Sequence, residues 1–362
     1  MRNRKIIFTG FLCIIIPLIT FSCRSTPSVR GYFQEEHSYI NIEGIPASED
    51  MVLDKWHTPP RILVSSDGGS SKQLHGAIYA VDIDTNVATE MIREGEPEGF
   101  DFHPLGIDIV QDREGNTILY VITRQSLPES TSYAVRTYEV IFNRLVFIQS
   151  FEDFLLVSPN DITIDSDRGF YVSNGSRSRS GILQMMFSSD VSNVVFCDND
   201  GQWSVAAEGF KMANGLTTKG KQVFVADTEK NAVYRFTRRT GGGLGEKVLF
   251  VQIWSPENLT HSGNRLLVAS NPKAFSLSRI LTGQNRRAPT YIYSIQLADK
   301  QVKPVFFDDG SRITSATVGV RYRDSLYVGQ IHDPFVLKFT GTLVLTKSTI
   351  HGIIHTAYDD IF

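Results

Sequence analysis

Apolar positions along the chain recur in short groups rather than in long helical stripes. A triplet of two large apolar residues followed by valine occurs six times, at Ile62–Val64, Leu119–Val121, Phe170–Val172, Val223–Val225, Leu266–Val268 and Leu326–Val328. Another short apolar segment lies roughly ten to fourteen residues upstream of each valine, and an alternating segment such as Ala77–Val81 follows four of the triplets. The unit repeats roughly every fifty residues, and three or four short strands per unit are typical of a propeller blade. The sequence therefore predicts an all-β fold, a six-bladed β-propeller.

The N-terminal residues have the pattern of an export signal. Met1–Lys5 is basic, and the apolar run from Ile6 to Phe21 is shorter than a bilayer span requires. The run ends at Ser22-Cys23, which resembles the lipobox of a bacterial lipoprotein, with Cys23 as the lipidated residue. An ordinary signal peptide or an uncleaved anchor is the alternative.

We therefore expect four segments. Residues 1–22 would be a lipoprotein-type signal peptide, 23–45 a lipidated cysteine with a tether, 46–345 the propeller and 346–362 a C-terminal segment that closes on the propeller. This organisation predicts a monomer in the bacterial cell envelope, periplasmic or surface-facing, with a lipid anchor in the membrane.

Composition and cysteine usage narrow the function classes. The formal net charge is −3 and the chain has no basic stripe, so nucleic acid is not an expected partner. Of three cysteines, Cys13 lies in the removable segment and Cys23 at the lipid site, which leaves Cys197 alone. Ring closure must then rely on strand pairing, and Cys197 is expected to be a buried strand residue. The absence of a Gly-x-Ser-x-Gly elbow disfavours a serine hydrolase.

Polar residues open the segment upstream of several triplets. In a propeller the first strand of each blade lines the axis, so residues at one phase of these strands converge on a point. Glu49, Asn160, Asn214, Glu257 and Asn258 would supply two carboxylates and three amide carbonyls. An all-oxygen set of this kind suits Ca²⁺, whereas zinc would favour His or Cys. Singly, each of these residues is a common turn former or cap.

Adjacent residues complicate this convergence. Neighbours in a regular strand point to opposite faces. Glu257 and Asn258 can therefore reach one ion only where the strand is irregular. By the same argument Asn160 and Asp161 are expected to serve two different points, one on either side of their strand.

The chain resembles the paraoxonase/arylesterase family and, more distantly, gluconolactonase-type and strictosidine-synthase-like propellers. The residues that carry the resemblance extend over about residues 46 to 340, and their order and spacing are more specific than any one motif. They are Glu49-Asp50, Pro104–Ile107, Pro159–Ile162, Ala206–Phe210, Met212–Gly215, Glu257–Leu259 and Thr317-Val318 followed by Leu326–Gly329.

This resemblance implies a hydrolase of lactones or aryl esters with two Ca²⁺ ions on the propeller axis. The catalytic ion would be held by Glu49, Asn160, Asn214, Glu257 and Asn258, with Glu257 where the family usually has aspartate. The structural ion would be held by Asp50, Asp161 and the backbone carbonyl of Ile107. Calcium in such a site polarises a carbonyl and stabilises the developing oxyanion.

Two departures from the family pattern concern proton transfer. Leu105 and Arg124 stand where the family has a histidine pair that is proposed to activate water. The remaining candidate bases are Glu49, His103 and His332, and each histidine has a surface or capping role as its alternative. The missing pair also leaves a second function open, a non-catalytic calcium-stabilised propeller that binds a ligand or protein partner at the cell envelope.

Overall fold

The structure is a computed structural model that describes residues 32–33, 37–68, 75–98, 101–126, 131–165, 168–175, 192–272, 289–341 and 343–344. All of these belong to one compact unit, Gly31–Leu345. The expected signal peptide, Cys23 and C-terminal segment lie outside the described residues. Every regular element within the described ranges is a β-strand, and these ranges contain no helix able to cross a membrane.

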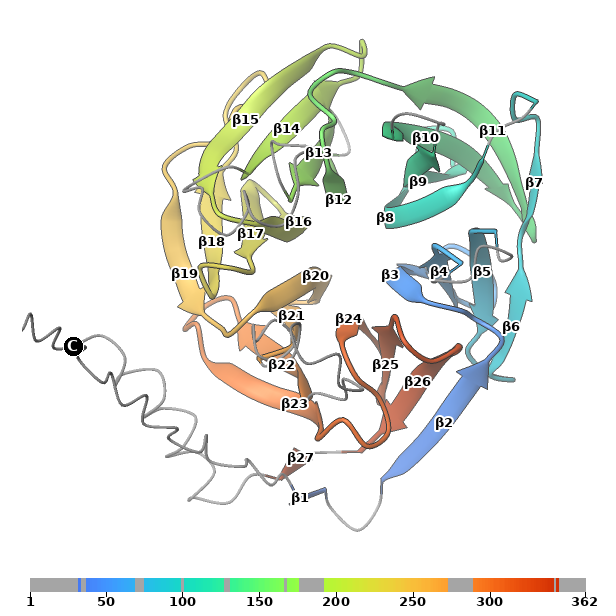
Figure 1. Ribbon diagram of the computed structural model, residues 1–362, viewed down its shortest axis with the longest axis vertical. Helices are drawn as coiled ribbons and strands as arrows, with labels where there is room; N and C mark the ends of the chain where they lie inside the picture. The colour runs from blue at the N-terminus through green and yellow to red at the C-terminus, as the bar shows by residue number, and fades with distance from the viewer. Residues whose placement is uncertain are drawn as a thin grey trace, which may run out of the picture. The chain divides into compact units, whose positions relative to one another are not determined.

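Six antiparallel sheets surround an axis, which confirms the predicted six-bladed propeller (Figure 1). Blade one contains β3 (Ser48–Asp54), β4 (Arg61–Ser66), β5 (Ala77–Asp82) and β6 (Val87–Glu90). Blade two contains β8 (His103–Gln111), β9 (Thr117–Ser126), β10 (Thr131–Ile141) and β11 (Arg144–Phe151), with β7 (Ile92–Glu94) parallel to β11. Blade three contains β12 (Pro159–Asp165), β13 (Gly169–Asn174), β14 (Ser192–Asp198) and β15 (Trp203–Phe210).

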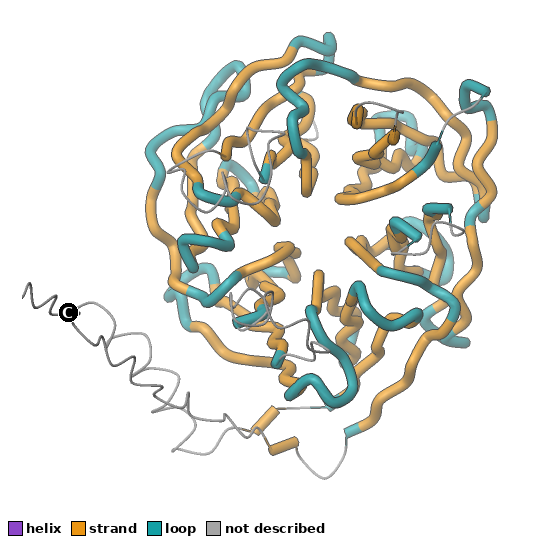
Figure 2. The backbone as a smooth tube through the Cα atoms, viewed as in Figure 1, coloured by secondary structure: helices purple, strands orange, loops and turns teal. Residues whose placement is uncertain are grey.

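The other three blades repeat this order. Blade four contains β16 (Ala213–Lys219), β17 (Gln222–Asp227), β18 (Ala232–Thr237) and β19 (Val248–Gln252). Blade five contains β20 (Pro256–Ser262), β21 (Arg265–Ser270), β22 (Thr290–Gln296) and β23 (Val302–Asp308). Blade six contains β24 (Ala316–Tyr322), β25 (Ser325–Gln330), β26 (Phe335–Thr340) and β2 (Ser38–Glu43). A short pair, β1 (Tyr32–Phe33) with β27 (Leu343–Val344), stands apart from the blades, and Figure 2 shows loops joining the strands of each blade.

The apolar triplets lie on the second strand of each blade, and packing explains why they do not alternate with polar residues. The core consists of six clusters, one between each pair of adjacent blades. A second strand is buried on both faces. Ile62 and Val64 pack between blades six and one, whereas Leu63 packs between blades one and two. Consecutive residues of one strand therefore enter two different cores.

The ring closes through strand pairing between the two ends of the unit. β2 pairs with β26 in register from Ser38↔Thr340 to Glu43↔Phe335. The sequence had placed residues 38–43 in the tether, but they form the outer strand of blade six. This strand carries no continuous apolar signal because Ile42 is its only fully buried residue. The Ser48 hydroxyl adds a second link, since it donates to the Gln330 carbonyl at 3.1 Å and accepts from the Gln330 N–H at 2.9 Å.

Candidate metal and active site

Each inner strand pairs irregularly with its neighbour one residue after it begins. The register shifts lie between Ser48 and Asp50, Pro104 and Ile107, Pro159 and Ile162, Ala213 and Leu216, Pro256 and Leu259, and Ala316 and Gly319. A bulge of this kind bends the strand and redirects the side chains within it. The same local irregularity therefore occurs six times around the axis, at the end where the inner strands begin.

The bulge residues line a small cavity on the axis, which we call the amide cavity. It measures about 50 Å³ and is lined by Glu49, Leu105, Gly106, Asn160, Asn214, Glu257, Asn258 and Thr317. All five side chains predicted for the catalytic ion thus meet in one place. Glu257 and Asn258 both reach it because their strand is irregular there, as the prediction required. Thr317 was not predicted, although it occupies the same position in its strand as Asn160 and Asn214.

Close backbone approach around the amide cavity depends on glycine. A Cβ atom on Gly215 would lie 2.4 Å from the Cα of Asn258 and 2.5 Å from the carbonyl oxygen of Glu257. One on Gly106 would lie 2.6 Å from the Cα of Asp161. The bulges of blades two and four can therefore pack directly against those of blades three and five.

The amide groups of this cavity leave one buried oxygen atom, the Asn258 Oδ1, without a donor among the described residues. The Asn258 Nδ2 donates to the backbone carbonyl of Glu49 at 3.1 Å, and the Asn258 Oδ1 is buried with no partner among the described residues. The Asn214 Nδ2 donates to the Glu257 carboxylate at 2.6 Å and to the Thr228 hydroxyl at 3.0 Å. Both amide nitrogens are thus occupied by protein acceptors, and a buried orphan oxygen remains.

The two carboxylates of the cavity are held in unfavourable surroundings for their charge. Burial, together with the charges of Asp67 and Glu257, raises the pKa of Glu49 from its ordinary 4.5 to about 7. Arg124 opposes this effect. Burial likewise raises the pKa of Glu257 to about 7, although hydrogen bonding by Asn214 acts in the opposite direction. A cation in the cavity would offset both costs.

The second set of predicted ligands lies on the other side of the bulges. Asp50, Asp161 and Ile107 line a larger cavity of about 210 Å³, which we call the far cavity. Asn160 lines one cavity and Asp161 the other, so the two neighbours face opposite ways as expected. The Asp50 carboxylate accepts the N–H of Ile107 at 2.9 Å, and the Asp161 carboxylate accepts the N–H of Leu216 at 2.7 Å.

These buried carboxylates also have raised pKa values. Burial raises the pKa of Asp50 to about 7. It raises the pKa of Asp161 well above its ordinary value, and the nearby charge of Asp50 adds to the effect. Asp108, which the sequence analysis did not select, lies beside them with a pKa raised by burial to about 6, and it accepts the N–H of Ile164 at 2.8 Å. In the sequence, the position of Asp108 directly after the predicted ligand Ile107 could have indicated it.

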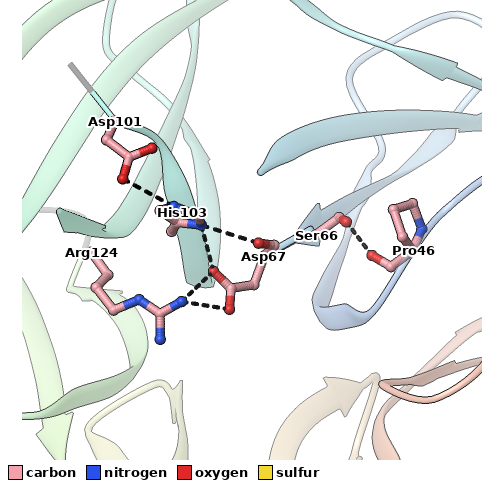
Figure 3. A network of polar contacts seen from close by, with 6 residues as sticks. All are labelled: Pro46, Ser66, Asp67, Asp101, His103 and Arg124. Atoms are coloured by element: carbon pink, nitrogen blue, oxygen red, sulfur yellow. Dashed lines mark hydrogen bonds and ion pairs between the residues drawn. The ribbon is translucent and has the colours of Figure 1, made fainter. Parts of the chain in front are cut away.

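A polar network joins the loop after β4 to β8 and β9, between blades one and two (Figure 3). Arg124 Nη2 contacts both carboxylate oxygens of Asp67, at 2.9 and 2.8 Å. His103 Nδ1 lies 3.0 Å from the Asp67 Oδ1, and His103 Nε2 lies 3.1 Å from the Asp101 Oδ2. Both ring nitrogens of His103 therefore face acceptors, and His103 does not line the amide cavity. Asp67 and Asp101 have no periodic signal in the sequence because loops, not inner strands, carry them.

The third candidate base lies elsewhere. His332 is exposed in the turn after β25, and its backbone N–H donates to the side chain of Gln330 at 3.2 Å. Cys197 is buried on β14, as predicted, and burial raises the pKa of its thiol to about 12. Among the residues with described positions, no three His, Cys, Asp or Glu side chains gather in a metal-binding group. The oxygen donors of the amide cavity are instead two carboxylates mixed with amides.

Comparisons with known proteins assign the chain to a family. The family profile described as Arylesterase matches residues 69–336. Serum paraoxonase/arylesterase 2 of Homo sapiens is 24% identical over 313 residues, which cover 80% of this chain and 85% of that protein. Serum paraoxonase/lactonase 3 of Oryctolagus cuniculus is 25% identical over 278 residues, which cover 71% and 74% respectively.

Solved structures share the fold. A gluconolactonase from Xanthomonas campestris superposes with a TM-score of 0.56 at 12% identity, covering 86% of this chain and 91% of that one. The PQQ-bound aldose sugar dehydrogenase of Streptomyces coelicolor superposes with a TM-score of 0.55 at 13% identity, covering 85% and 99%. At this identity the superpositions show the propeller alone, whereas the profile covers most of the chain. This chain belongs to the arylesterase (paraoxonase) family.

Proposed function

We propose that this chain hydrolyses a small-molecule lactone or aryl ester in the amide cavity, with the aid of a bound Ca²⁺ ion. Membership of the arylesterase family makes it a hydrolase of the esterase and lactonase type. The observation that carries the finer proposal is the convergence of five oxygen-bearing side chains from four blades on one cavity of about 50 Å³. These side chains are Glu49, Asn160, Asn214, Glu257 and Asn258.

The donor chemistry of the cavity supports calcium. Ca²⁺ accepts six to eight oxygen ligands and tolerates irregular geometry. The Asn258 Oδ1 is buried without a partner in the described part of the chain, and burying an unsatisfied polar atom is costly. Two carboxylates whose pKa values rise to about 7 add a demand for positive charge. We further propose a second, structural Ca²⁺ held by Asp50, Asp161 and the backbone carbonyl of Ile107.

The proton transfer in this proposal falls to Glu49. Bound Ca²⁺ would polarise the substrate carbonyl and offset the negative charge that develops on its oxygen. The Glu49 carboxylate lines the amide cavity and accepts no hydrogen bond from the described residues, so it is available as the general base. Glu257 is less available, because the Asn214 amide donates to it at 2.6 Å.

The network of Asp67, His103 and Arg124 then has a positioning role. Arg124 occupies the place of a family histidine, but Asp67 holds it through two contacts. His103 is held between Asp67 and Asp101 and does not line the amide cavity. We assign these residues to shaping the mouth of the amide cavity and to setting the charge around Glu49.

Purified protein assayed on phenyl acetate and a panel of lactones, with and without a chelator, tests the proposal. We expect turnover that requires Ca²⁺ and that falls strongly in Asn214→Ala and Glu49→Gln. Asn264→Ala is the matched control, since Asn264 lies exposed in the hairpin between β20 and β21. Turnover that survives exhaustive chelation would refute the metal-dependent mechanism.

The alternative is a calcium-stabilised propeller that binds a ligand or protein partner without catalysis. Leu105 in the place of a family histidine favours this alternative, because its side chain cannot transfer a proton. Bound calcium that the fold requires, with no turnover of any ester or lactone, would select it.

We also propose that a lipid on Cys23 anchors the protein in the cell envelope. The basic start, the short apolar run and the Ser22-Cys23 boundary support this assignment. Labelling with a radioactive fatty acid should mark the wild-type protein and not Cys23→Ser. Equal labelling of both would overturn it.

A further inference from the structure

The far cavity opens at the end of the propeller where the inner strands finish, opposite the amide cavity. Its volume of about 210 Å³ is lined by residues from the inner strands of all six blades. Asp50 and Asp161 form its inner part, and Lys55, His261 and Arg321 lie toward the strand ends. Val318 is the residue of β24 equivalent to Asp50 of β3, each the third of its strand, and Arg321 lies three residues further on, so the two levels are about 10 Å apart along the strand.

Basic side chains gather at this outer level, in the same cavity that Asp50, Asp108 and Asp161 also line. Lys55, His261 and Arg321 make no ion pair with any residue that the structure describes. Burial lowers the pKa of His261, and the charges of Lys219 and Lys55 lower it further. Burial and then the charge of Arg265 lower the pKa of Arg321, with Asp324 as the opposing charge. Three cationic groups, Lys55, Lys219 and Arg265, thus lie within electrostatic range of His261 or Arg321, and the carboxylate of Asp324 opposes Arg265 at Arg321.

Two of the basic side chains at this level lie beside uncharged groups. The Lys55 Nζ lies 4.7 Å from the ring centroid of Trp56, which also lines the cavity. The His261 Nδ1 lies 3.5 Å from the Thr217 hydroxyl. Lys55, His261 and Arg321 come from blades one, five and six, which are neighbours in the ring, so the three side chains belong to one part of the cavity wall. Several donors grouped on one wall match an anion with several acceptor oxygens better than a planar monocarboxylate.

We propose that the outer part of the far cavity binds a small, multiply charged oxyanion of the phosphate type through Lys55, His261 and Arg321. The guanidinium supplies a two-donor fork and the ammonium a compact charge, which are the usual means of phosphate recognition. The carboxylates of Asp50 and Asp161 lie deeper and keep the anion at the outer level. The anion is either free in solution or the headgroup phosphate of a lipid, because the recognising chemistry is the same.

Binding of inorganic phosphate to the purified full-length protein tests this site, with sulfate and acetate as comparison probes. We expect saturable binding of phosphate that weakens about tenfold in Arg321→Gln, which corresponds to the loss of one charge-assisted contact. Lys55→Gln should weaken it as an independent second variant. Lys303→Gln, an exposed lysine on the outer strand of blade five, is the matched control and should bind as wild type does.

A fourth variant separates the far cavity from the amide cavity. Asn258→Ala alters the amide cavity and should leave phosphate binding unchanged. The proposal is overturned if phosphate does not saturate, if Arg321→Gln and Lys55→Gln bind it as wild type does, or if Asn258→Ala alone abolishes binding. Sedimentation with phosphatidylcholine vesicles, with and without phosphatidate, then identifies the source. Retention that requires phosphatidate and Arg321 indicates a lipid headgroup, and phosphate binding without retention indicates a free anion.

Discussion

Replacing Gly215 by alanine perturbs the candidate site without changing any charge or ligand. Gly215 lies in the bulge of blade four, and its added Cβ would meet the Cα of Asn258 at 2.4 Å, the carbonyl oxygen of Glu257 at 2.5 Å and the N of Leu259 at 2.6 Å. All three atoms belong to the backbone of blade five. A rotamer change cannot relieve such contacts, so the two inner strands must separate.

The size of the effect follows from these distances. Ordinary Cβ contacts begin at 3.4 Å, so the blades must move apart by about 1 Å. Overpacking of this kind costs about 1–3 kcal/mol, and we expect the upper end because only backbone can yield. For a domain of this size that corresponds to a fall in Tm on the order of 5 °C. Since the displaced residues include Glu257 and Asn258, kcat/KM should fall about a hundredfold for a displacement of 1 Å.

The assay compares thermal unfolding and ester hydrolysis of Gly215→Ala with those of Gly243→Ala. Gly243 has no atom within 4 Å of its added Cβ, so this substitution controls for the loss of glycine itself. If Gly215→Ala matches Gly243→Ala in both Tm and kcat/KM, blades four and five do not pack as described and the geometry of the amide cavity is wrong.

Three further predictions concern the metal and the ring. Asn258→Ala removes the unpartnered Oδ1 and the Nδ2 that donates to the backbone carbonyl of Glu49. A calcium titration followed by Tm should therefore show at least a tenfold weaker calcium affinity. An unchanged affinity would contradict the assignment of Asn258 as a calcium ligand. Burial raises the pKa of Asp50 from 3.8 to about 7, so this carboxyl stabilises the metal-free fold by about 4 kcal/mol at pH values below 3.8, and the contribution is lost as the pH rises through about 7. Calcium should therefore raise Tm more at pH 8 than at pH 5. An increase in Tm that does not depend on pH would exclude the buried carboxylates as calcium ligands. Deleting residues 38–43 leaves β26 as an open edge and should lower Tm and cause aggregation, whereas Ile40→Ser on the same strand, at an exposed position, should behave as wild type.

The repeat made the blades and most of the candidate site predictable from sequence. Six equivalent strands place equivalent positions around one axis, so Asn160, Asn214 and Glu257 could be grouped although they stand far apart in the chain. The adjacency of Glu257 and Asn258 was resolved only by the structure. A bulge changes the direction of two consecutive side chains, and no residue type in Pro256–Leu259 specifies one.

Residues outside the repeat were not predictable in this way. Asp67 follows β4 and Asp101 precedes β8, and their approach to His103 depends on how blades one and two pack against each other. β2 was missed for a different reason. An outer strand buries little, and its exposed alternation resembles that of a polar linker.

The pairing of β2 with β26 also dictates when folding can finish. The ribosome releases residues 335–340 about 300 residues after residues 38–43, and bringing such distant segments together costs about 5 kcal/mol of chain entropy. Blades one to five can assemble as they are synthesised, but the earliest-made strand has no partner until the last blade arrives. A translation product that stops before residue 335 therefore cannot complete the ring, and its free strand edges mark it for quality control.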